Sequence, residues 1–116
     1  MKIRSSFVSN SSSCSFIIKN ISSEPKTLRD FVLENARLFY DFCERYDYKE
    51  DEHFSLGKMV NDSIKPMYDR TFEPDVEEIC SFGDEDGTTL GHVFDYMLRD
   101  GGESKSFEWR FHEFQR

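Results

Sequence analysis

The chain has 116 residues and a net charge of -8; 37% of its residues are hydrophobic and 16% are aromatic. This length fits one domain that buries a core without disulfides or metals, and so many aromatic residues exclude an intrinsically disordered chain. No apolar segment approaches the roughly 20 residues that cross a bilayer, and the basic start lacks the apolar region of a secretory signal, so we expect no membrane association.

The first 20 residues predict a β-hairpin. The segments KIRSSFV and CSFIIKN resemble strands, and the Asn and Ser side chains between them stabilise turns by bonding to nearby backbone. Such a loop could also present hydroxyl and N–H groups to an anion. However, phosphate-binding loops contain glycine and lysine and precede a helix, whereas a strand follows here. The expected loop comprises Ser9, Asn10, Ser11, Ser12 and Ser13.

The segment 27–47 predicts the main helix. Its apolar residues recur every three or four positions, as on one face of a helix. We expect Thr27 to cap the N-terminus, with Asp30 in the place of the capping-box acid. A short second helix is expected within 54–72, where Pro66 would end or bend it.

The segment 76–116 predicts a strand, a helix and a strand. Residues 76–82 alternate imperfectly between apolar and polar, GDEDG forms a turn, and Thr88 or Thr89 caps a helix that ends at the Gly101-Gly102 pair. The alternation in 106–113 is that of a half-buried strand. The order β-β-α-(α)-β-α-β predicts an α+β fold, a single-domain sandwich in which a sheet of about four strands carries two to three helices on one face.

Acidic residues are concentrated in 73–103, which holds ten of them and one base, whereas residues 1–20 hold three bases and no acid. This charge repels nucleic acid, so direct nucleic-acid binding is not expected, and it favours a basic protein surface as partner. A solvated acidic face that serves only solubility is the alternative. The acids expected to bind a partner are Glu77, Glu78, Asp84, Glu85 and Asp86.

The patterns for metal binding and catalysis are incomplete. GDEDG resembles a calcium loop, but Phe82 stands where the first carboxylate ligand belongs. The three cysteines are widely spaced, which indicates buried, reduced thiols. His92 with Asp84 or Asp86 is the best catalytic constellation. We therefore predict no enzyme, no catalytic residue, no metal and no cofactor; an enzyme that uses this pair, with a divalent ion, is the alternative.

The N-terminal string FVSNSSSCSF, residues 7–16, resembles a pattern, FVSNSSSSSF, in small uncharacterised proteins of tailed phages and bacteria; Cys14 replaces a serine. SFGD at 81–84, Gly87 and FEWRF at 107–111 are similar to parts of the same group. The resemblance implies a small accessory protein of phage origin and implies no catalytic residue.

Two hypotheses for function follow from the charge and the resemblance. The first is a phage-encoded, non-enzymatic binding protein, located in the host cytoplasm, that occupies a basic surface of a host nucleic-acid-handling protein during host takeover or anti-defence. The second is a minor capsid or tail accessory protein of the virion, whose partners are other virion proteins.

Overall fold

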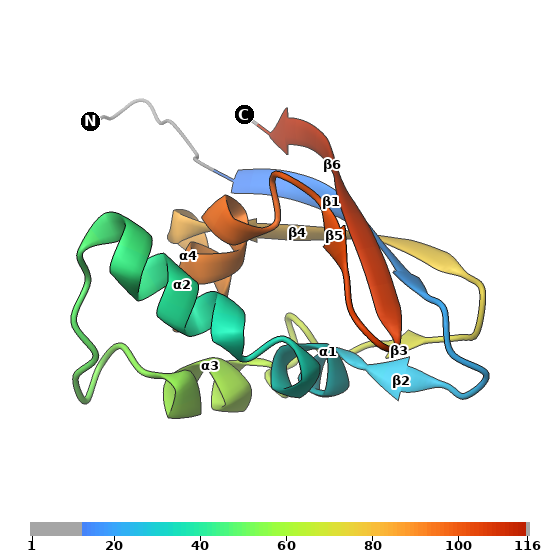
Figure 1. The fold of residues 1–116 in the computed structure, drawn as a ribbon, viewed down its shortest axis with the longest axis horizontal. Coiled ribbons are helices and arrows are strands. Elements are labelled where there is room, and N and C mark those ends of the chain that lie inside the picture. Colours follow the sequence, from blue (N-terminus) through green and yellow to red (C-terminus); the bar gives the residue numbers. More distant parts are fainter. Residues whose placement is uncertain (1–12, 116) are drawn as a thin grey trace.

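The computed structural model describes residues 13–115, and it confirms a single-domain α+β fold (Figure 1). The elements are β1 (Ser13–Asn20), β2 (Lys26–Thr27), α1 (Leu28–Glu34), α2 (Arg37–Tyr46), α3 (Leu56–Asp62), β3 (Thr71–Phe72), β4 (Glu77–Gly83), the 3₁₀ helix η1 (Asp84–Asp86), α4 (Thr89–Met97), β5 (Gly102–Glu103) and β6 (Phe107–Gln115). No helix in this range is long and apolar enough to span a membrane.

The main sheet has four antiparallel strands in the order β4-β1-β6-β5, and β2 pairs with β3 in a separate small sheet. The expected strand at residues 14–20 is β1, which pairs on one side with β4 and on the other with β6. The fourth strand is the short β5, which the sequence did not predict. The first strand of the expected N-terminal hairpin lies outside the described residues. Ser13, the one described member of the serine loop, is the first residue of β1.

The main helix is divided in two, so the prediction of one continuous helix over 27–47 was wrong. The capping box at its start is confirmed, because Thr27 and Asp30 exchange side-chain and backbone hydrogen bonds. Asn35 ends α1: its side-chain nitrogen donates to the Phe31 carbonyl at 3.1 Å and to the Ser104 hydroxyl at 3.2 Å. A side chain that bonds its own helix backbone in this way competes with continuation of the helix.

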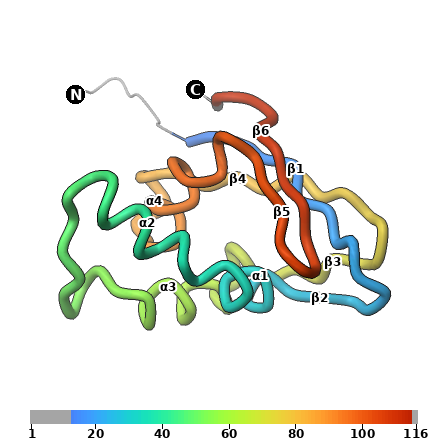
Figure 2. The backbone as a smooth tube through the Cα atoms, viewed as in Figure 1, coloured from blue at the N-terminus to red at the C-terminus, as the bar shows by residue number. Residues whose placement is uncertain are grey.

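The helices lie on one side of the main sheet (Figure 2). Phenylalanines fill the core between the sheet and the helices. Phe31 of α1 lies at the centre, with ring centroids 5.5 Å from Phe94 of α4 and 5.0 Å from Phe107 of β6. Rings of this size bury a large apolar area each, which explains how a chain with a low hydrophobic share closes a core. The fully buried phenylalanines include Phe16, Phe31, Phe39, Phe42, Phe72, Phe82, Phe94 and Phe107.

Strand β4 forms one edge of the main sheet. The Arg70 guanidinium donates from Nη1 to the Ile79 carbonyl at 3.0 Å and lies 3.9 Å from the Glu78 carboxylate. Glu77 pairs with Arg110 of β6 at 3.1 Å across the solvent-facing side of the sheet. The edge therefore carries charged side chains, and the Arg70 side chain donates a hydrogen bond to one of its carbonyls, that of Ile79.

Candidate functional site

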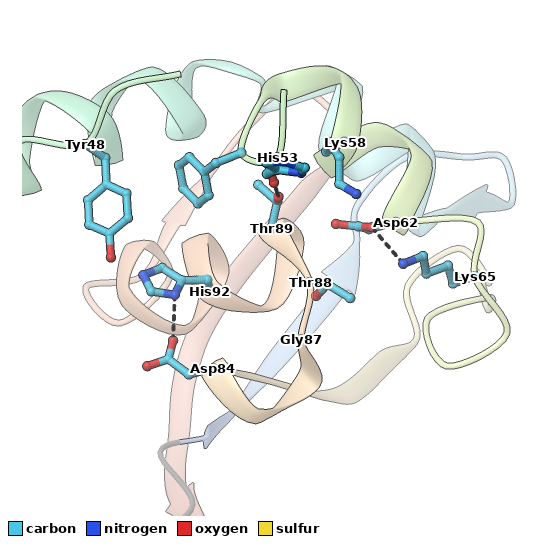
Figure 3. Close-up of a pocket in the computed structure, with 11 residues that line it drawn as sticks. Tyr48, His53, Lys58, Asp62, Lys65, Asp84, Gly87, Thr88, Thr89 and His92 are labelled. Carbon is cyan, nitrogen blue, oxygen red and sulfur yellow. Dashed lines mark hydrogen bonds and ion pairs between the residues drawn. The ribbon is translucent and has the colours of Figure 1, made fainter. Parts of the chain in front are cut away.

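A histidine–aspartate pair lies where η1 meets the first turn of α4. His92 Nδ1 is 2.9 Å from Asp84 Oδ1, and the dashed line in Figure 3 marks this contact. A carboxylate accepts, so Nδ1 carries the proton and donates it, which leaves Nε2 as the other functional atom of the ring. Figure 3 shows the Tyr48 ring beside the edge of the imidazole turned away from Asp84. The sequence left Asp84 and Asp86 open as partners, and the structure pairs His92 with Asp84.

Asp86 serves a different purpose, because it holds the turn that positions Asp84. The Tyr68 hydroxyl donates to Asp86 Oδ2 at 2.6 Å, and the Gly83 amide donates to the same oxygen at 3.2 Å. The Thr88 hydroxyl lies 2.7 Å from the Tyr68 hydroxyl. Burial, and then the hydrogen bond to Asp86, raise the pKa of Tyr68 above that of an ordinary phenol. The Tyr68 hydroxyl therefore stays protonated, and its hydrogen bond to Asp86 stabilises the turn at η1.

Two glycines allow α4 to lie so close to this turn. Gly87 has a φ of 70°, the left-handed conformation that favours glycine. A Cβ at Gly91 would lie 2.7 Å from the Gly83 carbonyl oxygen and 2.7 Å from Asp86 Oδ2. The helix can approach η1 only because Gly91 has no side chain, and this approach brings His92 within reach of Asp84.

Aromatic rings form a wall between α2 and α4. Phe42 and Tyr46 are one turn apart on α2 and face His92 and Tyr96, one turn apart on α4. The Phe42 ring meets the His92 ring edge-on with centroids 5.2 Å apart, and the Tyr46 and Tyr96 centroids are 5.4 Å apart. Tyr48 folds back after α2, with its centroid 5.1 Å from Phe42. This ring cluster was not predicted: the spacing of i and i+4 places two rings on one face of each helix, but it does not place the two faces together.

Two cavities meet at His92, Asp84 and Tyr48, which line both. The aromatic cavity has a volume of about 280 Å³, and the polar cavity, drawn in Figure 3, about 360 Å³. The lining of the aromatic cavity consists of Phe42, Tyr46, Tyr48, Asp84, His92 and Tyr96. The polar cavity is lined by Tyr48, His53, Phe54, Lys58, Asp62, Lys65, Asp84, Gly87, Thr88, Thr89 and His92.

Several polar groups of the polar cavity are already bonded within the chain. The Asp62 carboxylate is buried, accepts from the Leu90 amide at 3.2 Å and pairs with Lys65 at 3.2 Å. The next amide of α4, that of Gly91, donates to the Thr88 hydroxyl at 2.9 Å. Free amides at a helix N-terminus attract anions. Here the chain's own Asp62 carboxylate and Thr88 hydroxyl accept from the Leu90 and Gly91 amides, so these two amides are already used within the fold.

The five acids expected to bind a partner do not form one face. Glu77 lies on the solvent side of β4, whereas its neighbour Glu78 points to the other side and is half-buried. Asp84 lines the two cavities and Asp86 is turned toward Tyr68. Glu85 is exposed. Of the serine loop, residues 9–12 lie outside the described range, and Ser13 is buried.

The cysteines are free thiols, and Cys14 and Cys80 are buried. Burial, and then a hydrogen bond to the Asp95 carboxylate, raise the pKa of Cys14 to about 11. Burial raises the pKa of Cys80 also to about 11. Such thiols stay protonated near neutral pH and are poor nucleophiles. Within residues 13–115, no group of three or more His, Cys, Asp or Glu side chains is arranged to hold a metal ion.

Comparison with family models, with curated proteins and with solved structures finds no match to this chain. The chemistry open to the site therefore follows from its own residues: a carboxylate–imidazole pair between an aromatic cavity and a polar cavity in which Asp62 pairs with Lys65.

Proposed function

We propose that the chain is a small, non-enzymatic binding protein of a phage that occupies a basic surface of a host protein that handles nucleic acid. The phage origin rests on the resemblance of residues 7–16. The binding role rests on charge complementarity, which speeds the encounter with a basic partner and competes with phosphate for the same surface.

The observation that carries this proposal is the convergence of exposed acids from two segments at one end of the molecule. Tyr48 of the α2–α3 connection and Asp84 of η1 line the same two cavities, so the two segments lie together. The connection 47–52 contains one lysine among its acids. The exposed acids of the two segments are Asp47, Glu50, Asp51, Glu52, Asp84 and Glu85.

An affinity capture from host lysate at low and high salt tests the proposal. Exposed ion pairs are screened by salt, so a basic nucleic-acid-binding protein should be captured at low salt and lost at high salt. The double charge reversal Glu52→Lys with Glu85→Lys should weaken capture. The matched control is Glu24→Lys, an exposed glutamate in the β1–β2 turn at the opposite end of the molecule (Figure 1).

Capture that is equal at both salt concentrations, or that Glu24→Lys weakens as strongly as the double reversal, would contradict the proposal. Recovery of the protein in purified phage particles, with no host partner, would support a virion accessory role instead.

General-base catalysis at His92 is a second candidate, which the contact between His92 Nδ1 and Asp84 Oδ1 favours. With Nδ1 donating to a carboxylate, Nε2 is the ring atom that would take a proton from water. The threonine hydroxyls beside it are engaged: Thr88 accepts from Gly91, and Thr89 donates to the His53 carbonyl at 3.5 Å. Such an enzyme would therefore activate water directly.

Hydrolysis of p-nitrophenyl acetate and of bis-p-nitrophenyl phosphate separates the two candidates. The non-enzymatic proposal expects the wild-type chain and His92→Gln to have the same background rate. A wild-type rate above buffer that falls at least tenfold in both His92→Gln and Asp84→Asn would establish catalysis and overturn the first proposal.

A further inference from the structure

We propose that the aromatic cavity binds the cationic end of an arginine or lysine side chain. This inference rests on the proposed function, because it names the group by which a basic partner would be anchored. The occupant is an ammonium or guanidinium group carried on an alkyl stem.

The shape of the cavity is the first argument. Four benzene-type rings and one imidazole surround it: the centroids of Phe42 and Tyr46 are 4.9 Å apart, and those of His92 and Tyr96 are 5.7 Å apart. Tyr48 closes another side, with its centroid 5.4 Å from His92. Ring faces carry negative potential and attract cations, most strongly where several rings surround one site.

The charge of the cavity is the second argument. Asp84 supplies a carboxylate to its wall, and the described residues contribute no lysine or arginine to the lining. Burial raises the pKa of Tyr96, and the negative charge of Asp84 is the next cause. The field of Asp84 is thus felt at the Tyr96 ring. A cation entering the cavity would experience the carboxylate and the ring faces together.

Tyr96 already makes one such contact inside the fold. The Arg99 guanidinium carbon lies 4.7 Å from the Tyr96 centroid, while Nη2 of the same group pairs with Asp95 at 3.1 Å. Arg99 does not line the aromatic cavity. The chain therefore uses one combination of aromatic ring and carboxylate for its own arginine, and presents a second combination, with more rings, to solvent.

The size of the cavity selects the ligand. A volume of about 280 Å³ lies just below the range of typical ligand pockets, roughly 300–1,000 Å³. Tyr46 and Tyr48 are 41% and 42% exposed, so the cavity opens to solvent beside the acidic connection. It suits one side chain of a larger partner better than a cofactor or nucleotide.

Titration followed by aromatic ¹H–¹³C NMR tests the inference without any partner protein. The probes are the N-acetyl methylamides of arginine, lysine and trimethyllysine, with the citrulline derivative as the neutral analogue of arginine. The cationic probes should shift the ring signals of Tyr46, Tyr48 and Tyr96, and the citrulline probe should not. The affinities of the three cationic probes show whether the cavity prefers a guanidinium, an ammonium or a quaternary ammonium group.

The variants are chosen to keep the fold. Tyr48→Leu and Asp84→Asn should each weaken binding of the preferred probe about fivefold. The matched control is Tyr40→Leu, because Tyr40 is also on α2, is 51% exposed and does not line the cavity. The unaffected part of each spectrum reports that the variant is folded.

Two outcomes would overturn the inference: equal shifts with citrulline and arginine, or equal losses of affinity in Tyr40→Leu and Tyr48→Leu. If these occur while salt and the Glu52/Glu85 reversal still abolish partner capture, the proposed function stands and the cavity has no part in it. If the cationic probes bind as expected but no basic host protein is captured, the cation site stands and the proposed function fails.

Discussion

The two cavities that meet at His92 use their polar groups in opposite ways. In the polar cavity, the Asp62 carboxylate accepts from the Leu90 amide and pairs with Lys65. The hydrogen bond to Leu90 joins α3 to α4, so this carboxylate has a structural role. In the aromatic cavity, aromatic side chains and the Asp84 carboxylate line a space that opens to solvent. Charged groups that line a cavity can thus serve the fold itself, so a polar lining alone does not mark a binding site.

Removal of the Asp62 carboxylate should destabilise the fold more than any other change proposed here. Asp62→Ala leaves the Leu90 amide without its acceptor in a buried position and deprives Lys65 of its partner. We expect a loss of about 3 kcal/mol in unfolding free energy. Urea denaturation measures it. Asp62→Asn, whose amide oxygen can still accept from Leu90, should lose clearly less, and equal losses in the two variants would contradict this account.

Tyr68→Phe should have the next largest effect. It removes the hydroxyl that donates to Asp86 and contacts Thr88, so the turn that carries Asp84 loses its lock. We expect about 2 kcal/mol of destabilisation. The His92 ring signals in NMR should also shift, because Asp84 moves relative to the imidazole. Tyr40→Phe removes an exposed hydroxyl from α2 and is the control; a comparable loss there would refute the specific role of Tyr68.

A rise to alkaline pH should lower the unfolding free energy, and we expect this effect to be the smallest of the three. The pKa values of Tyr68 and Tyr96 are raised by burial, and next by the Asp86 hydrogen bond and the Asp84 charge, respectively. Their contribution to stability is complete below the unfolded-state phenol pKa of about 10. It is lost as pH rises from there through the folded-state pKa values, because the unfolded chain releases these protons first.

Urea denaturation at several pH values from 8 to 11 measures this decline. The buried thiols of Cys14 and Cys80, whose pKa values are also raised, add to it in the same direction. Tyr68→Phe should show a shallower decline than the wild-type chain. Stability that is unchanged or rises between pH 9 and 11 would be inconsistent with phenols held protonated by the fold.

Sequence signals were reliable where they were local. Thr27 caps α1 as expected, and Thr88, one of the two candidates, caps α4, since capping depends on residues within one turn. The break at Asn35 was missed because the Asn35 side chain also bonds Ser104, far along the chain. β5 was missed because two residues that include a glycine carry no strand pattern.

The candidate site was predictable only in part for the same reason. The short separation of Asp84 and His92 allowed their pairing to be anticipated, but the choice between Asp84 and Asp86 depended on Tyr68, which comes from a distant segment. Tyr96 joins the cluster because α2 packs against α4, and Tyr48 joins it because the chain folds back after α2. Periodicity within one helix reveals neither contact.

The exposed edge of β4 has a consequence for the behaviour of the protein at high concentration. An unpaired strand edge is a template on which a second copy could add its own strand, the first step toward aggregation. Arg70 covers the Ile79 carbonyl, and the charged side chains of Glu77 and Glu78 lie at the start of this edge strand. Charged residues on an edge strand disfavour such pairing. We therefore expect Arg70, Glu77 and Glu78 to disfavour strand addition between copies of the molecule.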